Sequence, residues 1–176
     1  MKTFKIGGVH PAENKLTAEV PSRPAAIPAQ AVFSMYQHIG SPAKPVVKKG
    51  DVVKVGTLLA EADGFVSAPI YSSVSGTVSK VDAIVDASGY RRPAIIVDVQ
   101  GDEWEEEIDR STDLVTLADR PELTSEDIVA RVKKAGIVGM GGATFPTHVK
   151  LTPPPGSKAD CVVINGAVSY THLTLP

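Results

Sequence analysis

The sequence predicts an α+β chain in which a small β barrel or sandwich precedes the start of an α/β domain. Short apolar runs, punctuated by 15 glycines and 14 prolines among 176 residues, predict turns and short strands rather than long helices. One helical periodicity occurs late in the chain, at residues 124–136, and a glycine-rich loop follows it. Aromatic residues make up only 5% of the chain, so aliphatic side chains are expected to fill the core.

The composition excludes several classes of protein. A formal net charge of −2 argues against a generally basic nucleic-acid binder. The single cysteine, Cys161, excludes a disulfide framework and any iron–sulfur or zinc site built from cysteines alone, which needs about four thiolates. The first residues lack the apolar segment of a secretory signal, and prolines and polar residues interrupt residues 24–43. We therefore expect a soluble protein that reaches a membrane only through partners.

Residues 1–39 predict a basic, extended arm. Seven Lys or Arg and two Asp or Glu occur within residues 1–50, which gives this block a net charge of +5. Prolines recur every few residues, and proline fits neither a helix interior nor a central strand. The arm is therefore expected to be irregular, with short edge strands. Its positive charge is expected to be solvated, and an acidic partner surface is the alternative.

Residues 40–100 predict the β domain. Short apolar runs alternate with turn signals at Gly50, at Gly56, at Asp63-Gly64 and at Ser88-Gly89. Strands this short and this closely spaced indicate a small barrel or sandwich.

The order of turns and apolar residues in this domain resembles the biotinyl/lipoyl-like domain, which is a barrel-sandwich hybrid. The resemblance is carried by Lys49-Gly50-Asp51, Gly56, Leu58, and the runs at residues 66–69 and 75–78. In the carrier proteins of that family, a lysine at the exposed hairpin tip accepts biotin or lipoate. The corresponding tip here is Glu61-Ala62-Asp63-Gly64, without a lysine. The resemblance therefore implies a scaffold, and the alternative, a covalent carrier, would show an added mass.

Residues 101–123 predict an acidic connector. Within residues 98–127, two basic residues stand against twelve acidic ones, a net charge of −10. Such a segment is typical of a solvated link between two folded parts. Trp104 is expected to anchor the connector on a neighbouring surface.

Residues 124–136 predict one helix. Thr124 or Ser125 can cap its first turn, and the spacing of Thr124 and Asp127 is close to that of a capping box. Apolar residues follow at helical spacing, and lysines occupy the last turn, where they suit the helix dipole. Gly136 is the expected terminator.

The loop after this helix contains Gly136, Gly139, Gly141 and Gly142 within seven residues. Glycines let the backbone approach a ligand closely and point N–H groups at it. Lys150 adds a mobile charge that can pair with a phosphate. The spacing fits neither a dinucleotide-binding fingerprint nor a P-loop. The residues alone leave two interpretations open, a phosphate or cofactor site and an ordinary tight turn.

A family resemblance favours the first interpretation. The pattern Gly139-x-Gly141-Gly142-Ala143-x-Phe145-Pro146-Thr147-x-x-Lys150 is similar to the flavin- and NADH-binding loop of the complex I 51-kDa subunit family. The longer run at residues 141–151 resembles the RnfC family of the Rnf electron-transport complex. The amino-terminal Gly7-Gly8-Val9-His10-Pro11-x-Glu13-Asn14-Lys15 and the later Pro153-Pro154-Pro155-Gly156 resemble the same family. This resemblance spans roughly residues 4–167.

The resemblance implies a function and a site. The Rnf complex exchanges electrons between NADH and ferredoxin and couples this to ion translocation across a membrane. RnfC is its peripheral component on the cytoplasmic, NADH-binding side of the bacterial membrane, bound to the other Rnf subunits, with FMN and two [4Fe–4S] clusters of its own. By resemblance, Gly139, Gly141, Gly142 and Lys150 would cradle FMN, Phe145 would help hold the NAD(H) nicotinamide, and Asn165 would reach FMN from a strand end.

Two departures from the family limit what this chain can do. The family continues after Asn165-Gly166-Ala167 with Glu-Cys-Glu-Pro, whereas residues 168–176 here break the pattern, which predicts a non-native tail. The cysteine-rich cluster domain does not occur, and one cysteine cannot ligate a cubane cluster. We therefore expect an N-terminal fragment, with the start of the flavin domain at residues 124–167, that is inactive by itself. The alternative is a docking module of a membrane complex without redox chemistry.

The remaining candidate residues predict no further site. The four histidines have no metal-ligand spacing with a carboxylate or thiol, so no metal is expected. Cys161 begins an apolar run and is expected to be buried and inert.

Overall fold

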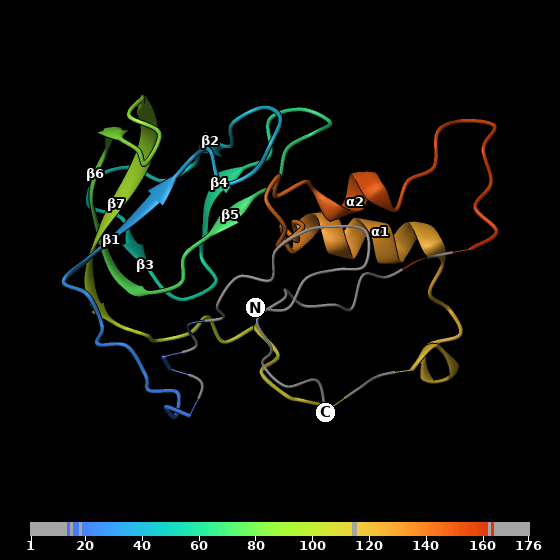
Figure 1. Cartoon of the computed structure of the whole chain (residues 1–176), viewed down its shortest axis with the longest axis horizontal. Helices are drawn as coiled ribbons and strands as arrows, with labels where there is room; N and C mark the ends of the chain where they lie inside the picture. Colours follow the sequence, from blue (N-terminus) through green and yellow to red (C-terminus); the bar gives the residue numbers. More distant parts are fainter. Residues whose placement is uncertain (1–13, 15, 18, 114–115, 162, 164–176) are drawn as a thin grey trace, which may run out of the picture.

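In the computed structural model a β domain and a small helical part lie side by side (Figure 1). The structure describes residues 14, 16–17, 19–113, 116–161 and 163. The elements within this part are, in chain order, β1 (Gln30–Ser34), β2 (Lys44–Pro45), β3 (Val52–Val53), β4 (Leu58–Glu61), β5 (Ile70–Tyr71), β6 (Ser75–Val85), β7 (Arg91–Gly101), the 3-10 turn η1 (Leu117–Asp119), α1 (Ser125–Lys134) and α2 (Thr147–Lys150).

The strands form two antiparallel sheets. The larger sheet has the order β1-β7-β6-β3, and the smaller one has the order β2-β4-β5. A long hairpin, β6–β7, dominates the larger sheet, and its turn is fixed by Asp86, whose carboxylate accepts from the backbone N–H of Ser88 and of Tyr90. β6 and β7, with eleven residues each, are longer than the short strands predicted, whereas β1 to β5 have two to five residues. The closely spaced turns and the two facing sheets agree with the barrel-sandwich hybrid predicted from the sequence.

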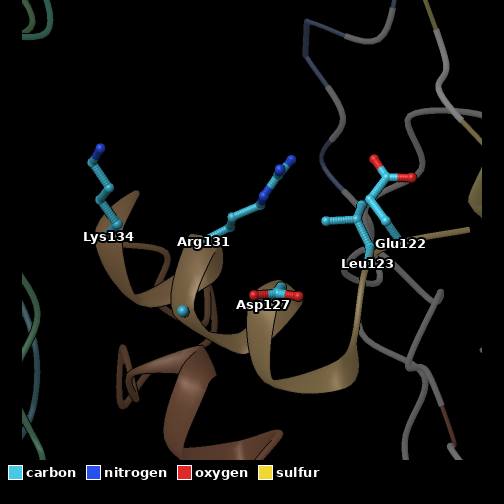
Figure 2. A pocket seen from close by; sticks show the side chains of 6 residues that line it. Glu122, Leu123, Asp127, Arg131 and Lys134 are labelled. Atoms are coloured by element: carbon cyan, nitrogen blue, oxygen red, sulfur yellow. The ribbon is translucent and has the colours of Figure 1, made fainter. Parts of the chain in front are cut away.

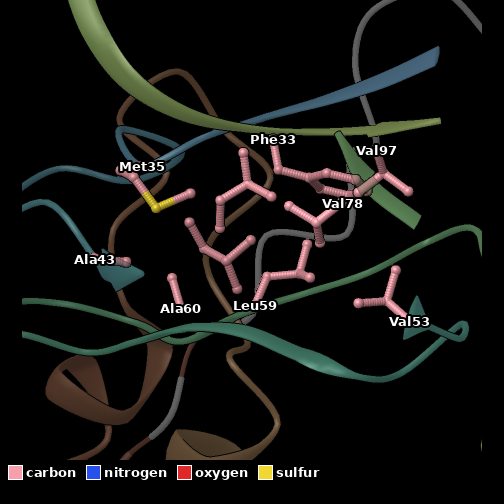
Figure 3. Packing of buried hydrophobic residues seen from close by; sticks show 10 residues of the cluster. Phe33, Met35, Ala43, Val53, Leu59, Ala60, Val78 and Val97 are labelled. Atoms are coloured by element: carbon pink, nitrogen blue, oxygen red, sulfur yellow. The ribbon is translucent and has the colours of Figure 1, made fainter. Parts of the chain in front are cut away.

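The two sheets enclose one aliphatic core (Figure 3). Met35, Leu59, Ile95 and Val97 are each 0% exposed. The cluster of buried residues consists of Phe33, Met35, Ala43, Val53, Leu59, Ala60, Ile70, Val78, Ile95 and Val97. Phe33 is the one aromatic side chain in this cluster, as the low aromatic content of the chain suggested.

The last part of the predicted arm contributes to this core. β1 pairs with β7 at the edge of the larger sheet, with Val32 opposite Ile96 and Phe33 opposite Ile95. Phe33 and Met35 are buried in the common core. The arm therefore supplies the edge strand expected of it, and this strand shares its core with the residues after position 40.

The acidic connector begins against the barrel. The N–H of Val55 donates to the carbonyl of Glu103, and the N–H of Glu105 donates back to the carbonyl of Val55. The ammonium of Lys54 lies 2.7 Å from the Glu103 carboxylate, and this bond raises the pKa of Lys54. Trp104 lies opposite Val55, and the Arg110 guanidinium stacks on its ring. The first residues of the connector are thus attached to the β domain.

α1 begins and ends as the sequence predicts. Thr124 is the N-cap, and a complete capping box links its hydroxyl and backbone N–H to Asp127. Gly136 follows the last turn with a φ of +66°, a left-handed conformation that glycine adopts without strain. α1 has no fully buried residue, although its sequence is amphipathic. Among the described residues, no helix is both long and apolar enough to cross a lipid bilayer.

Candidate functional site

The glycine loop, residues 136–147, joins α1 to α2 and folds back on itself. The N–H of Gly139 donates to the carbonyl of Phe145 over 2.8 Å, and the N–H of Thr147 donates to the carbonyl of Ile137 over 2.9 Å. A tighter turn lies inside, where the N–H of Thr144 donates to the carbonyl of Gly141. These bonds bring the two ends of the loop together and leave its middle free.

The middle of the loop offers unpaired backbone donors. Within the described residues, the N–H groups of residues 140–143 have no hydrogen-bond partner. A Cβ placed on Gly141 or Gly142 would meet no atom within 4 Å, so the space above both residues is open. Consecutive free N–H groups in an open turn are the arrangement that binds anions.

Lys150 brings a cation to the same loop. It is exposed, it lies in the last turn of α2, and its Nζ would be 2.6 Å from a Cβ on Gly139. A side chain at position 139 would therefore meet the ammonium, which can move aside because it ends a flexible, exposed side chain. No acidic residue occurs between positions 128 and 159, whereas five lysines and arginines do. The local field therefore favours an anionic group.

The structure brings five of the six predicted site residues together. Gly139, Gly141, Gly142, Phe145 and Lys150 all belong to the loop or to α2, which follows it directly. Phe145 is half-buried, and its carbonyl closes the loop. Asn165 and the suspected tail at residues 168–176 lie outside the described residues. The residues present fit the phosphate end of a flavin nucleotide, because backbone N–H groups without a partner among the described residues and an exposed ammonium occur in the same short segment.

Both ends of the glycine loop are attached to the barrel. At its start, the Tyr71 hydroxyl of β5 donates to the carbonyl of Lys134, and partial burial raises the pKa of Tyr71. A Cβ on Gly136 would lie 2.5 Å from the carbonyl oxygen of Pro69, so backbone packs directly on backbone there. At its end, His148 in α2 contacts the carbonyl of Phe65. Sequence reasoning assigned no role to His148, and no local pattern indicates its partner 83 residues away.

A polar pocket of about 360 Å³ lies beside α1 (Figure 2). It is lined by Glu122, Leu123, Asp127, Ala130, Arg131 and Lys134. The Asp127 carboxylate already accepts the N–H and hydroxyl of Thr124, and these bonds hold the pKa of Asp127 below its usual value. No residue of the glycine loop lines this pocket, and its mixed charges indicate no ligand.

The prediction of a buried cysteine is wrong. Cys161 is exposed and lies in an irregular segment after the proline-rich stretch, so no sheet covers it. The apolar run around it indicated a strand, but a strand is buried only when a partner packs on it. Across the part of the chain that the structure describes, no three His, Cys, Asp or Glu side chains gather in a way that could hold a metal ion.

Comparison with known families decides the classification. Residues 2–102, more than half of the chain, match the RnfC barrel sandwich hybrid domain. The chain belongs to the RnfC family. Residues 132–174 match the Nuo51 FMN-binding domain, so the glycine loop and Lys150 lie within the start of a flavin domain. Both the fold class and the family resemblance inferred from the sequence are confirmed.

The curated relatives are C subunits of ion-translocating oxidoreductase complexes. The C subunit of the proton-translocating ferredoxin:NAD(+) oxidoreductase complex of Clostridium ljungdahlii is 45% identical over 99% of this chain and 37% of its own length. The C subunit of the Na(+)-translocating complex of Acetobacterium woodii is 45% identical over 98% and 38%. The C subunit of the ion-translocating oxidoreductase complex of Rhodobacter capsulatus is 40% identical over 99% and 33%. The chain thus spans little more than a third of the length of these relatives.

Proposed function

We propose that this chain is the N-terminal portion of the NADH-side subunit of an ion-translocating NADH:ferredoxin oxidoreductase, and that its glycine loop holds the phosphate of FMN. The observation that carries the proposal is the loop itself, where the N–H groups of residues 140–143 have no partner among the described residues, the space at Gly141 and Gly142 is open, and the Lys150 ammonium lies beside Gly139. The match of this segment to an FMN-binding domain supports the flavin as the ligand.

Residues of this chain would bind the phosphate of FMN and orient FMN and NAD(H). The amides of Gly141 and Gly142 would donate to the phosphate oxygens, and Lys150, whose ammonium lies beside Gly139, would neutralise their charge. Phe145, half-buried beside the loop, would present its ring to the nicotinamide of NAD(H), and Asn165 would contact FMN. When bound, FMN supplies hydride acceptance and single-electron release. The family's [4Fe–4S] clusters would be ligated by sequence beyond this chain.

The partners of the complex follow from the same proposal. The chain would work with the other Rnf subunits, with NADH and with ferredoxin, at the cytoplasmic face of the bacterial membrane. The chain contains one cysteine, whereas a [4Fe–4S] cluster needs about four, so this cysteine cannot hold such a cluster by itself.

The test of the site is a flavin titration of two proteins. We expect weak or no FMN binding by this 176-residue chain, because much of the pocket would come from later sequence, and clear binding by a version extended over the whole flavin domain. In the extended version Lys150→Ala should lower FMN affinity about tenfold or more, since it removes a charged hydrogen bond. Lys158→Ala, an exposed lysine outside the loop, is the control. An unchanged dissociation constant in Lys150→Ala would contradict the phosphate role.

One observation favours a second function for this piece alone. The barrel has a complete core, whereas α1 has no fully buried residue. A module of this kind can dock to partner subunits without any redox chemistry. Binding of the extended version to another Rnf subunit with no uptake of FMN would support this docking module and overturn the flavin site.

A further inference from the structure

The loop between β4 and β5 contacts α2. This segment, residues 62–69, is called the tip loop below, and it contains no lysine. The His148 imidazole is only 4% exposed, and its Nε2 lies 3.3 Å from the carbonyl oxygen of Phe65 in the tip loop. A part of the barrel and the element that carries Lys150 therefore meet at one buried side chain.

The tip loop holds the Phe65 carbonyl in a fixed place. The Ser67 hydroxyl is fully buried, accepts the N–H of Asp63 over 3.0 Å and donates to the carbonyl of Ser41 over 3.0 Å. The N–H of Ser41 donates in turn to the carbonyl of Val66 over 3.0 Å. These hydrogen bonds join the two sides of the tip loop to each other and the loop to the barrel at Ser41. They hold the backbone at Phe65 in place.

The chemistry of the contact fixes the state of the imidazole. A carbonyl oxygen only accepts hydrogen bonds, so Nε2 of His148 carries the hydrogen and donates to Phe65. The other nitrogen, Nδ1, is buried and has no partner among the described residues. A buried polar atom without a partner costs free energy. The single polar bond of the His148 side chain within this part of the molecule is therefore the one that joins α2 to the tip loop.

We propose that His148 is a positioning residue that fastens the glycine loop to the barrel, so that the barrel determines where Lys150 and the loop amides lie. His148 immediately follows Thr147, whose N–H closes the loop onto Ile137, and it precedes Lys150 by two residues. The start of the loop is attached through Tyr71 and through the backbone contact of Gly136 with Pro69, the last residue of the tip loop. The effect on FMN binding rests on the function proposed above, whereas the attachment itself does not.

The attachment is tested in the 176-residue chain without any flavin. Hydrogen exchange is measured at the amides of Gly139 and Thr147 in His148→Gln and in His148→Met. The glutamine side chain can place an amide N–H where Nε2 was, whereas methionine has a similar size and no donor. We expect the glutamine variant to keep the slow exchange and the methionine variant to exchange roughly tenfold faster, as for loss of one hydrogen bond. Phe65→Ala is the matched control, because it keeps the backbone carbonyl and should change nothing.

Amides of the barrel serve as an internal standard. Exchange at Ile95 and Val97, in the core of the barrel, should be equal in all variants. Equal loop exchange in the methionine variant and the unaltered chain would overturn the proposal, and so would a glutamine variant as fast as the methionine variant. Should the methionine variant unfold altogether, Ser67→Ala tests the contact from the barrel side, and unchanged exchange of the loop in that variant would overturn it.

The consequence for ligand binding is tested in a version extended over the flavin domain. Ser67→Ala touches no residue of the glycine loop, and we expect it to weaken FMN binding severalfold. In a His148→Met background the same change should have little further effect, because the connection is already broken. Effects that simply multiply would overturn a role for this contact in FMN binding. If the extended version binds no FMN at all, the proposed function fails, and the exchange result still decides the attachment.

Discussion

The barrel and the helical part of this chain are stabilised by different kinds of contact. The barrel closes two sheets over its own core, where Leu59 and Ile95 are fully buried. α1 is amphipathic and well capped, but none of its residues is fully buried, and α2 has only four residues. The helical part is positioned by a few contacts with the barrel, at Tyr71, Pro69 and Phe65. The comparison shows that, among the described residues, the glycine loop is positioned by contacts with the barrel rather than by a core of the helical part.

The largest expected effect comes from the barrel core. Leu59→Ala should destabilise the whole chain by about 3 kcal/mol, because it opens a cavity in the core and the helical part depends on the barrel. Val129→Ala, in the half-buried face of α1, should cost less than about 1 kcal/mol. The measurement is the midpoint of thermal unfolding by circular dichroism. Equal shifts in the two variants would contradict the difference between the two regions.

A smaller effect is expected where the two regions meet. Gly136→Ala should cost about 1–2 kcal/mol from its left-handed φ alone, and its Cβ would also press on the Pro69 carbonyl. Hydrogen exchange should therefore become faster in α1 and the glycine loop, with the barrel unchanged. Gly89→Ala is the control, because that glycine has a φ of +82° but no atom within 4 Å of the added Cβ. An effect of Gly136→Ala that spreads through the barrel would show that the two parts unfold as one.

The cap of α1 should contribute less still. Thr124→Ala removes the hydroxyl that accepts the Asp127 N–H, and the expected loss of helix stability is about 1 kcal/mol. Exchange of the α1 amides and the helical circular dichroism signal measure it. Ser125→Ala is the control, since that hydroxyl bonds only to the neighbouring Glu126 among the described residues. A loss with Ser125→Ala as large as with Thr124→Ala would place the cap one residue later.

Acid should break the hydrogen bonds between Thr124 and the Asp127 carboxylate in the same N-cap of α1. Bonds from the Thr124 N–H and hydroxyl hold the pKa of the Asp127 carboxyl below its usual value in the folded chain. The stabilisation is therefore complete above the usual value and is lost as the pH falls through the lowered one, below about pH 4. α1 should fray in that window in a titration followed by circular dichroism. Asp127→Asn cannot titrate and should lack this step, and an identical acid transition in that variant would assign it to other carboxyl groups.

Local features of the fold were predictable from the sequence. The turns at Gly50, Gly56 and Gly89 follow from glycine's freedom at positive φ, and all three have it. The capping box and the terminator of α1 follow from spacing alone. The pairing of β1 with β7, across roughly sixty residues of sequence, could not be predicted from the sequence, because strand register depends on contacts that no local pattern encodes.

The features of the candidate site also divide into local ones, which the sequence predicts, and ones that depend on contacts between distant segments. Its glycines and Lys150 were found because they lie close together in the sequence and recur as a family motif. The N–H groups of residues 140–143, which have no partner among the described residues, could be found only from the backbone path of the loop. The contact of His148 with Phe65 and the exposure of Cys161 were missed, because both depend on which distant segments pack together.

The position of the tip loop constrains any covalent modification of this barrel. Attachment of biotin or lipoate requires a modifying ligase to close around a hairpin tip and reach a protruding lysine. The N–H of Asp63 is bonded to Ser67, which holds Ser41, and the same loop lies against His148 at Phe65. A lysine introduced at Asp63 would extend from a loop whose backbone is bonded to Ser67 and, at Phe65, to His148, rather than from a hairpin tip without such contacts. Restoring the acceptor residue alone would therefore not turn this domain into a carrier.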